Sequence, residues 1–93
     1  MISVKISPLH IEDYLETDED IKEFLTELAR TGNYSDLMHG IATAARAKGM
    51  SNVAKQAGVT RASLYKSLSE DGNPRFETIN NVVEALGCKI AIV

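Results

Sequence analysis

Apolar side chains recur along most of this chain at the three- and four-residue spacings typical of amphipathic helices. The spacing predicts five helices, over about residues 18–31, 36–48, 51–57, 61–68 and 75–86. The inner faces expected for the first, second and fifth helices consist of Ile21, Phe24, Leu25 and Leu28; of Leu37, Met38, Ile41, Ala42 and Ala45; and of Phe76, Ile79, Val82, Val83 and Leu86. The pattern therefore predicts an all-α fold.

Residues that start and stop helices support these limits. Candidate N-cap side chains stand before four of the predicted helices: Thr17, Ser35, Ser51 and Thr60. Asp20 follows Thr17 by three residues and completes a predicted capping box with a short acid. Glycines follow the predicted helices, and Gly87 suits the C-terminal cap of the last one.

The two ends of the chain have a different pattern. Apolar and polar residues alternate over 1–6 and again over 88–93, which predicts short terminal β-strands. Residues 10–17 are interpreted as a connector with Ile11, Tyr14 and Leu15 packed into the core. Turn-forming residues dominate 69–74, so we expect a loop there.

The segment 50–69 has the composition that a helix-turn-helix requires. The first helix of such a motif needs a small residue at the crossing, the turn needs a residue that tolerates positive φ, and the second helix needs one buried stripe. The residues that fit these positions are Val53, Ala54 and Ala57 in the first helix, Gly58 and Val59 in the turn, and Leu64 and Leu68 in the second helix. We therefore interpret residues 1–93 as a single helix-turn-helix domain, with a strand and connector over 1–16 and a strand over 88–93.

The exposed positions of this segment carry side chains suited to DNA. The candidate DNA-binding residues are Ser51, Asn52, Thr60, Arg61, Ala62, Tyr65 and Lys66. An arginine can donate two hydrogen bonds to guanine in the major groove, and a threonine or alanine can touch a thymine methyl group. Hydroxyl, amide and ammonium groups near helix N-termini suit phosphates. The motif thus predicts a recognition helix that docks in the major groove.

The net charge of −3 conceals a strong asymmetry along the chain. Acids dominate residues 1–32, whereas bases dominate residues 46–75. Arg46, Lys48 and Lys55 are expected to add electrostatic affinity for DNA. Such asymmetry favours two surfaces with different tasks, although solvated acidic and basic faces remain the simpler alternative.

Other classes of function fit poorly. Cys88 is the only cysteine, so an internal disulfide is excluded, and it is expected to be a small core residue rather than a nucleophile. His10 and His39 lack neighbours at metal-ligand spacing, so no metal, cofactor or enzymatic activity is predicted. No apolar run is long enough for a membrane span or a signal peptide, and we expect a cytoplasmic protein.

Specific runs of residues also resemble a known family. They include Asp13–Leu15, Ala44–Met50, Ala57–Gly58, Ser63–Ser69, Gly72–Asn73–Pro74 and Ala85–Gly87, and the run SLYKSLSEDGNPRF is the most distinctive. The chain resembles the addiction-module antidote proteins, which are HigA-like antitoxins of type II toxin–antitoxin systems with a Cro/Xre-type helix-turn-helix. The resemblance implies a five-helix Cro/lambda-repressor-like domain.

The resemblance also implies partners. Members of that family act as homodimers, repress their own operon by binding operator DNA, and neutralise a RelE/ParE/HigB-like toxin encoded beside them. An acidic N-terminal third would meet a basic toxin by charge complementarity. Two alternatives stay open: a prophage or mobile-element transcriptional repressor without a toxin partner, and a helical module that binds only proteins.

Overall fold

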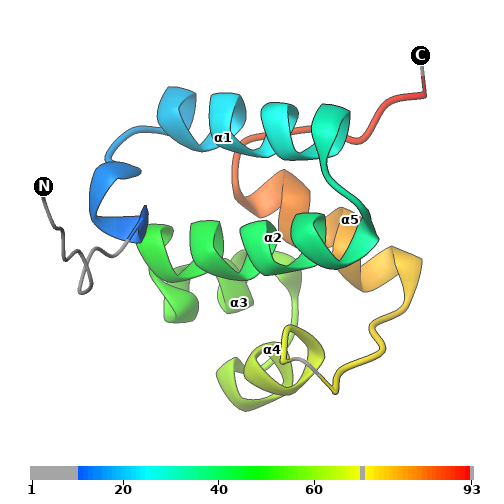
Figure 1. Cartoon of the computed structure of the whole chain (residues 1–93). Coiled ribbons are helices and arrows are strands. Elements are labelled where there is room, and N and C mark those ends of the chain that lie inside the picture. Colours follow the sequence, from blue (N-terminus) through cyan, green and yellow to red (C-terminus); the bar gives the residue numbers. More distant parts are fainter. Residues whose placement is uncertain (1–10, 70, 93) are drawn as a thin grey trace, which may run out of the picture.

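The computed structural model describes residues 11–69 and 71–92, and within them it contains one turn of 3-10 helix and five α-helices (Figure 1). The elements are η1 (Ile11–Tyr14), α1 (Asp18–Thr31), α2 (Tyr34–Lys48), α3 (Met50–Ala57), α4 (Arg61–Ser67) and α5 (Phe76–Ala85). The all-helical prediction and the number of α-helices are thus confirmed.

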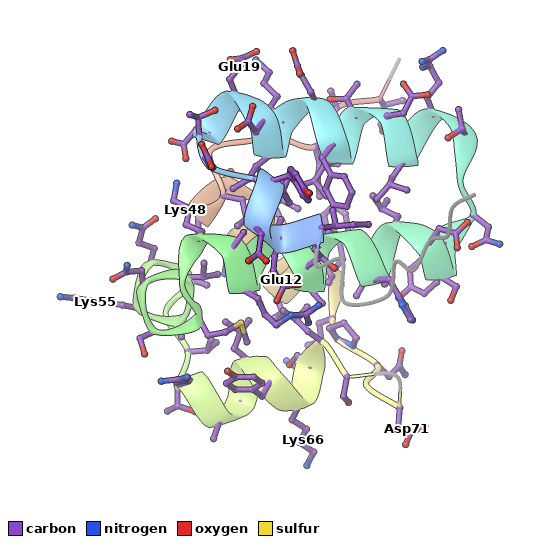
Figure 2. The ribbon with its side chains drawn as sticks, turned by 60° about the vertical axis from the view of Figure 1, so that its left-hand side comes forward. Glu12, Glu19, Lys48, Lys55, Lys66 and Asp71 are labelled. Atoms are coloured by element: carbon purple, nitrogen blue, oxygen red, sulfur yellow. The ribbon has the colours of Figure 1, made fainter. Side chains whose placement is uncertain are left out.

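The helices form a bundle with α2 near its middle. Helices α1 and α2 run antiparallel beside each other, joined by the short turn at Gly32 and Asn33 (Figure 1). Helix α3 packs against α5 and α2, and α4 contacts α3. In both views α1 and α4 lie at opposite ends of the molecule, with α2 between them (Figures 1 and 2). The bundle therefore offers two remote surfaces.

The core draws on all five α-helices. Its largest fully buried side chains are Ile41, Val53, Leu64, Val82 and Leu86. Most predicted inner-face residues are buried or pack against this core. Three apolar residues expected in the core are instead exposed: Ile11 (50%), Tyr14 (66%) and Phe76 (70%). They lie at the starts and ends of elements, where the helical spacing no longer fixes which side faces inward.

The N-terminal caps agree with the sequence at two helices. The Thr17 hydroxyl accepts the Asp20 N–H at 3.0 Å while the Asp20 carboxylate accepts the Thr17 N–H at 3.1 Å, which is the predicted capping box. Thr60 accepts the Ser63 N–H at 3.0 Å. Both helices therefore begin where predicted.

Two predicted caps are wrong. Helix α2 is capped by Asn33 rather than Ser35, because Asn33 forms a second capping box with Asp36. Helix α3 begins at Met50 with Gly49 at the cap position, so Ser51 lies inside the helix and caps nothing. Met50 is buried, and its packing against the core extends the helix by one residue on the N-terminal side of Ser51.

The predicted C-terminal strand is also wrong. Residues 88–92 form neither strand nor helix, and Ile90 and Ile92 are exposed. A strand needs a neighbouring strand to pair its backbone groups, and residues 11–69 and 71–92 supply none. The strand expected over 1–6 lies outside the described residues. Of the helices in the described part, none has the length and apolar character needed to cross a bilayer.

Candidate functional site

The turn between α3 and α4 has the geometry that the sequence predicts. Gly58 ends α3 in the left-handed conformation, with φ +77° and ψ 27°. The Val59 N–H then donates to the Ala54 carbonyl at 3.0 Å, as in a Schellman motif. A β-carbon at position 58 would touch nothing within 4 Å, so backbone conformation alone demands glycine there.

One buried side chain anchors α4 to the bundle. Leu64 is 0% exposed, while Val59 and Leu68 on either side of it are partly buried against the core. The first turn of α4 is further fixed by the Thr60 cap. An α4 of seven residues is too short to persist alone, so packing must hold it in place.

Arg61 links the exposed faces of α3 and α4. Its Nη1 donates to Ser51 Oγ at 3.2 Å, and its Nη2 donates to Tyr65 Oη at 3.2 Å. The guanidinium carbon also lies 5.4 Å from the centroid of the Tyr65 ring, within cation–π distance. All three side chains belong to exposed residues, so a positive group with further N–H donors is held in place at the surface.

The other candidate residues are exposed on the same two helices. Asn52 lies in the first turn of α3, and Ala62 and Lys66 lie one turn apart on α4. The Thr60 hydroxyl accepts the cap hydrogen bond but keeps a proton to donate. Seven predicted positions are thus all at the surface, while only Ser51, Arg61 and Tyr65 contact one another through hydrogen bonds.

The charge of this region is entirely positive. Residues 50–69 contain Lys55, Arg61 and Lys66 and no acid. Figure 2 shows Lys55 and Lys66 projecting away from the bundle, with Lys66 at the end opposite Glu19 of α1. Among the described residues none of these three cations is within ion-pair distance of a carboxylate. This edge therefore attracts anions.

Two bases expected to help are already compensated. Lys48 Nζ lies 2.7 Å from Asp18 Oδ1, and Arg46 Nε lies 3.6 Å from Glu12 Oε2. Both pairs tie the end of α2 to the acidic segment around η1 and the start of α1. The acidic and basic parts of the sequence thus meet at the end of α2. The bases of α3 and α4, by contrast, have no carboxylate partner among the described residues.

The sequence predicted a phosphate-binding helix N-terminus at Ser51 and Asn52, but it did not predict that Gly49 is the cap position of α3 or that Arg61 contacts Tyr65. Gly49 provides no side-chain cap, so no side chain accepts the first N–H groups of α3. Arg61 and Tyr65 are four residues apart in a predicted helix, and this spacing could have predicted their contact. The Ser51 contact depends on how the two helices cross, and local spacing does not give that.

Cys88 has the environment of an unreactive thiol. It is partly buried, and its Sγ lies 3.9 Å from the Leu86 carbonyl oxygen. Burial raises the pKa of the Cys88 thiol; the charges of Lys22 and Lys48 oppose this shift, and the charge of Asp18 adds to it. A raised pKa keeps the group protonated at neutral pH, and the thiolate is the nucleophilic form.

Comparison with known proteins identifies the family. The family described as "Probable addiction module antidote protein" matches residues 5–93, which is nearly the whole chain. The chain belongs to this antidote family. A protein of Haemophilus influenzae (strain KW20 / Rd), described as uncharacterized, is 32% identical over 88 residues, covering 95% of this chain and 91% of the relative. No solved structure matches the chain significantly. The antidote family predicted from the sequence motifs is confirmed, and membership indicates an antitoxin role.

Proposed function

We propose that this antidote-family protein is the antitoxin of a type II toxin–antitoxin module. In this proposal α3, the turn at Gly58 and α4 are a Cro/Xre-type helix-turn-helix of a HigA-like antitoxin, within one domain that spans residues 1–93. It binds operator DNA to repress its own operon in the cytoplasm, and it neutralises a RelE/ParE/HigB-like toxin. The observation that carries the DNA-binding half is the guanidinium of Arg61, held between Ser51 and Tyr65 on the helices α3 and α4, whose segment 50–69 contains no acid.

The proposed docking follows from the placement of these groups. Helix α4 enters the major groove with Arg61 directed at a guanine, a pair that contributes about 1–3 kcal/mol of discrimination between bases. Thr60 and Ala62 lie beside it for contacts with base edges or a thymine methyl group. When the guanidinium turns from Ser51 and Tyr65 toward a base, these two hydroxyls become free to contact phosphate.

Phosphate contacts fix the register of the two helices on DNA. The uncapped N-terminus of α3 presents backbone N–H groups beside Ser51 and Asn52, a combination that suits a phosphate. Lys55 of α3 and Lys66 of α4 project from the bundle (Figure 2) and supply salt-dependent affinity. A homodimer would place two such edges about 34 Å apart, one turn of DNA, and would predict a two-fold symmetric operator.

The DNA-binding half is tested by titrating labelled DNA from upstream of the reading frame with wild-type protein and two variants. Arg61→Ala should weaken operator binding by about tenfold to a hundredfold. The matched control is Arg30→Ala, which also removes one exposed positive charge, but from the far end of α1. Fluorescence anisotropy at several salt concentrations measures both the affinity and its salt dependence. Equal affinities for the two variants would contradict the assigned role of Arg61.

The toxin-binding half is tested by co-expression with the product of the neighbouring toxin-sized reading frame. A stable complex on size exclusion, together with restored growth of cells that express the toxin, is the expected result. Operator binding without any such complex would instead indicate a transcriptional repressor that has no toxin partner.

A further inference from the structure

An open hollow lies on the acidic side of the molecule, along α1. It has a volume of about 500 Å³ and is lined by Tyr14, Leu15, Asp20, Glu23, Phe24, Glu27 and Leu28. We name this feature the α1 groove. Its lining comes from η1, the connection after it, and one face of α1.

The α1 groove combines an apolar floor with an acidic rim. Phe24 and Leu28 are only partly buried, and Tyr14 is 66% exposed, so apolar side chains face the solvent here. Around them stand the carboxylates of Asp20, Glu23 and Glu27. Apolar surface ringed by polar groups is typical of a surface that binds another protein.

The three carboxylates differ in what they already contact. Asp20 accepts the backbone N–H groups of Glu16 and Thr17, and Glu27 accepts a hydrogen bond from Arg30. Glu23 is exposed and forms neither a side-chain hydrogen bond nor an ion pair with other described residues. It is therefore the rim carboxylate best able to pair with a cation from outside.

The α1 groove is remote from the candidate DNA-binding edge. Helix α1 lies at one end of the molecule and α4 at the other, with α2 between them (Figure 1). Nucleic acid would be repelled by the acidic rim, since phosphates and carboxylates carry the same charge. The acidic rim and the apolar floor instead fit a ligand that is positively charged and partly apolar.

We infer that the α1 groove docks a basic segment of the toxin, with one large apolar side chain inserted over Tyr14, Phe24 and Leu28. A lysine or arginine of the same segment pairs with Glu23. This inference rests on the proposed function, because it names the surface by which the antitoxin holds its toxin. It also makes toxin and DNA binding compatible, since the two partners occupy opposite ends of the molecule.

The test compares two charge reversals on the same helix. Glu23→Lys changes the rim of the α1 groove, whereas Glu19→Lys makes the same change in charge one turn earlier, outside the lining. Tyr14→Ala removes apolar floor without altering charge and, being exposed, leaves the core intact. Each variant is titrated with the product of the neighbouring toxin-sized reading frame by isothermal calorimetry. Circular dichroism confirms that each variant folds.

Glu23→Lys and Tyr14→Ala should each weaken toxin binding by about tenfold or more, the loss typical of a residue central to an interface. Glu19→Lys should weaken it less than about threefold, by long-range attraction alone. Operator binding of all three variants should equal or exceed that of the wild type.

Equal losses for Glu23→Lys and Glu19→Lys would overturn the inference, because only net charge would then matter. Undiminished binding by Glu23→Lys and Tyr14→Ala would overturn it too, while leaving the antitoxin proposal standing. If the wild-type chain binds no toxin, the antitoxin proposal itself fails. Dissociation of a dimer of this chain by Glu23→Lys, with toxin binding intact, would assign the α1 groove to a second copy and contradict the inference.

Discussion

The two pairs of consecutive helices in this protein, α1–α2 and α3–α4, are stabilised in different ways. Helices α1 and α2 have 14 and 15 residues, and each begins with a reciprocal capping box. Helices α3 and α4 have eight and seven residues, and of these two only α4 has a side-chain cap. Because short helices are marginal in water, the second pair depends more heavily on buried anchors.

The two pairs also differ in charge. The acids of η1 and α1 meet two bases of α2, whereas residues 50–69 contain bases and no acid. Reciprocal capping boxes and ion pairs to neighbouring elements are therefore concentrated in the first pair, and bases without a carboxylate partner among the described residues in the second. Because buried anchors hold α3 and α4, we expect that their exposed residues other than the cap residue Thr60 can be altered with little effect on the fold. Four predictions test this difference, from the largest expected effect to the smallest.

The strongest test removes the anchor of the second pair. Leu64→Ala should reduce the free energy of unfolding by about 2–5 kcal/mol, because Leu64 is fully buried and its truncation leaves a cavity. Leu68→Ala, at a partly buried position, should cost clearly less. Urea denaturation followed by circular dichroism measures both. A smaller loss for Leu64→Ala than for Leu68→Ala would show that α4 is anchored elsewhere.

The second test addresses the turn. Gly58→Val should destabilise the protein by at least about 1–2 kcal/mol, because a side chain at positive φ is strained and β-branched residues are the worst case. Gly58→Asn should cost less, since asparagine tolerates this conformation. A β-carbon at position 58 meets no atom within 4 Å, so thermal unfolding of the two variants reports mainly on backbone strain. Equal melting temperatures would contradict the assigned turn geometry.

The third test concerns the caps of the first pair. Asn33→Ala should cost about 1 kcal/mol, because it removes the acceptor for the Asp36 N–H. Ser35→Ala should be nearly neutral, since Ser35 lies inside α2 and caps nothing. If chemical denaturation gave the larger loss for Ser35→Ala, the cap would have been assigned to the wrong residue.

The smallest effect is expected at the ion pair between the end of α2 and the start of α1. Asp18→Asn should cost less than about 1 kcal/mol, because the Asp18 side chain is 68% exposed and such pairs are screened. Its cost should shrink further in about 1 M salt. A loss that does not respond to salt would show that Asp18 acts by a contact other than its charge.

Much of this difference could be predicted from the sequence. Helical spacing predicted the five helices. Thr17 and Thr60 predicted where α1 and α4 begin, and Gly58 predicted where α3 ends, because each of these residues acts on backbone groups within a few positions. Exposure of the candidate residues followed from the same spacing. Signals within a few residues were therefore sufficient to predict the helices and those limits that depend on nearby backbone groups.

The sequence predictions failed where two residues compete for the same role, or where the contact joins residues remote in sequence. Asn33 competes with Ser35 for the same helix start, and a sequence pattern alone does not rank them. The strand pattern at 88–92 lacks a partner strand in the described part of the chain, and pairing is not a local property. The ion pairs of Arg46 and Lys48 join residues remote in sequence, so only the fold brings them together.

The positions of the tyrosines provide intrinsic fluorescent probes of separate regions of the molecule. The chain contains three tyrosines and no tryptophan, and the structure sets Tyr14 in the α1 groove, Tyr65 beneath Arg61, and Tyr34 at the start of α2. Replacing two of them with phenylalanine at a time leaves one intrinsic fluorophore for each region. The emission of Tyr65 would then report movement of the Arg61 guanidinium away from its ring. The emission of Tyr14 would report a ligand in the α1 groove, and that of Tyr34 would serve as the reference signal.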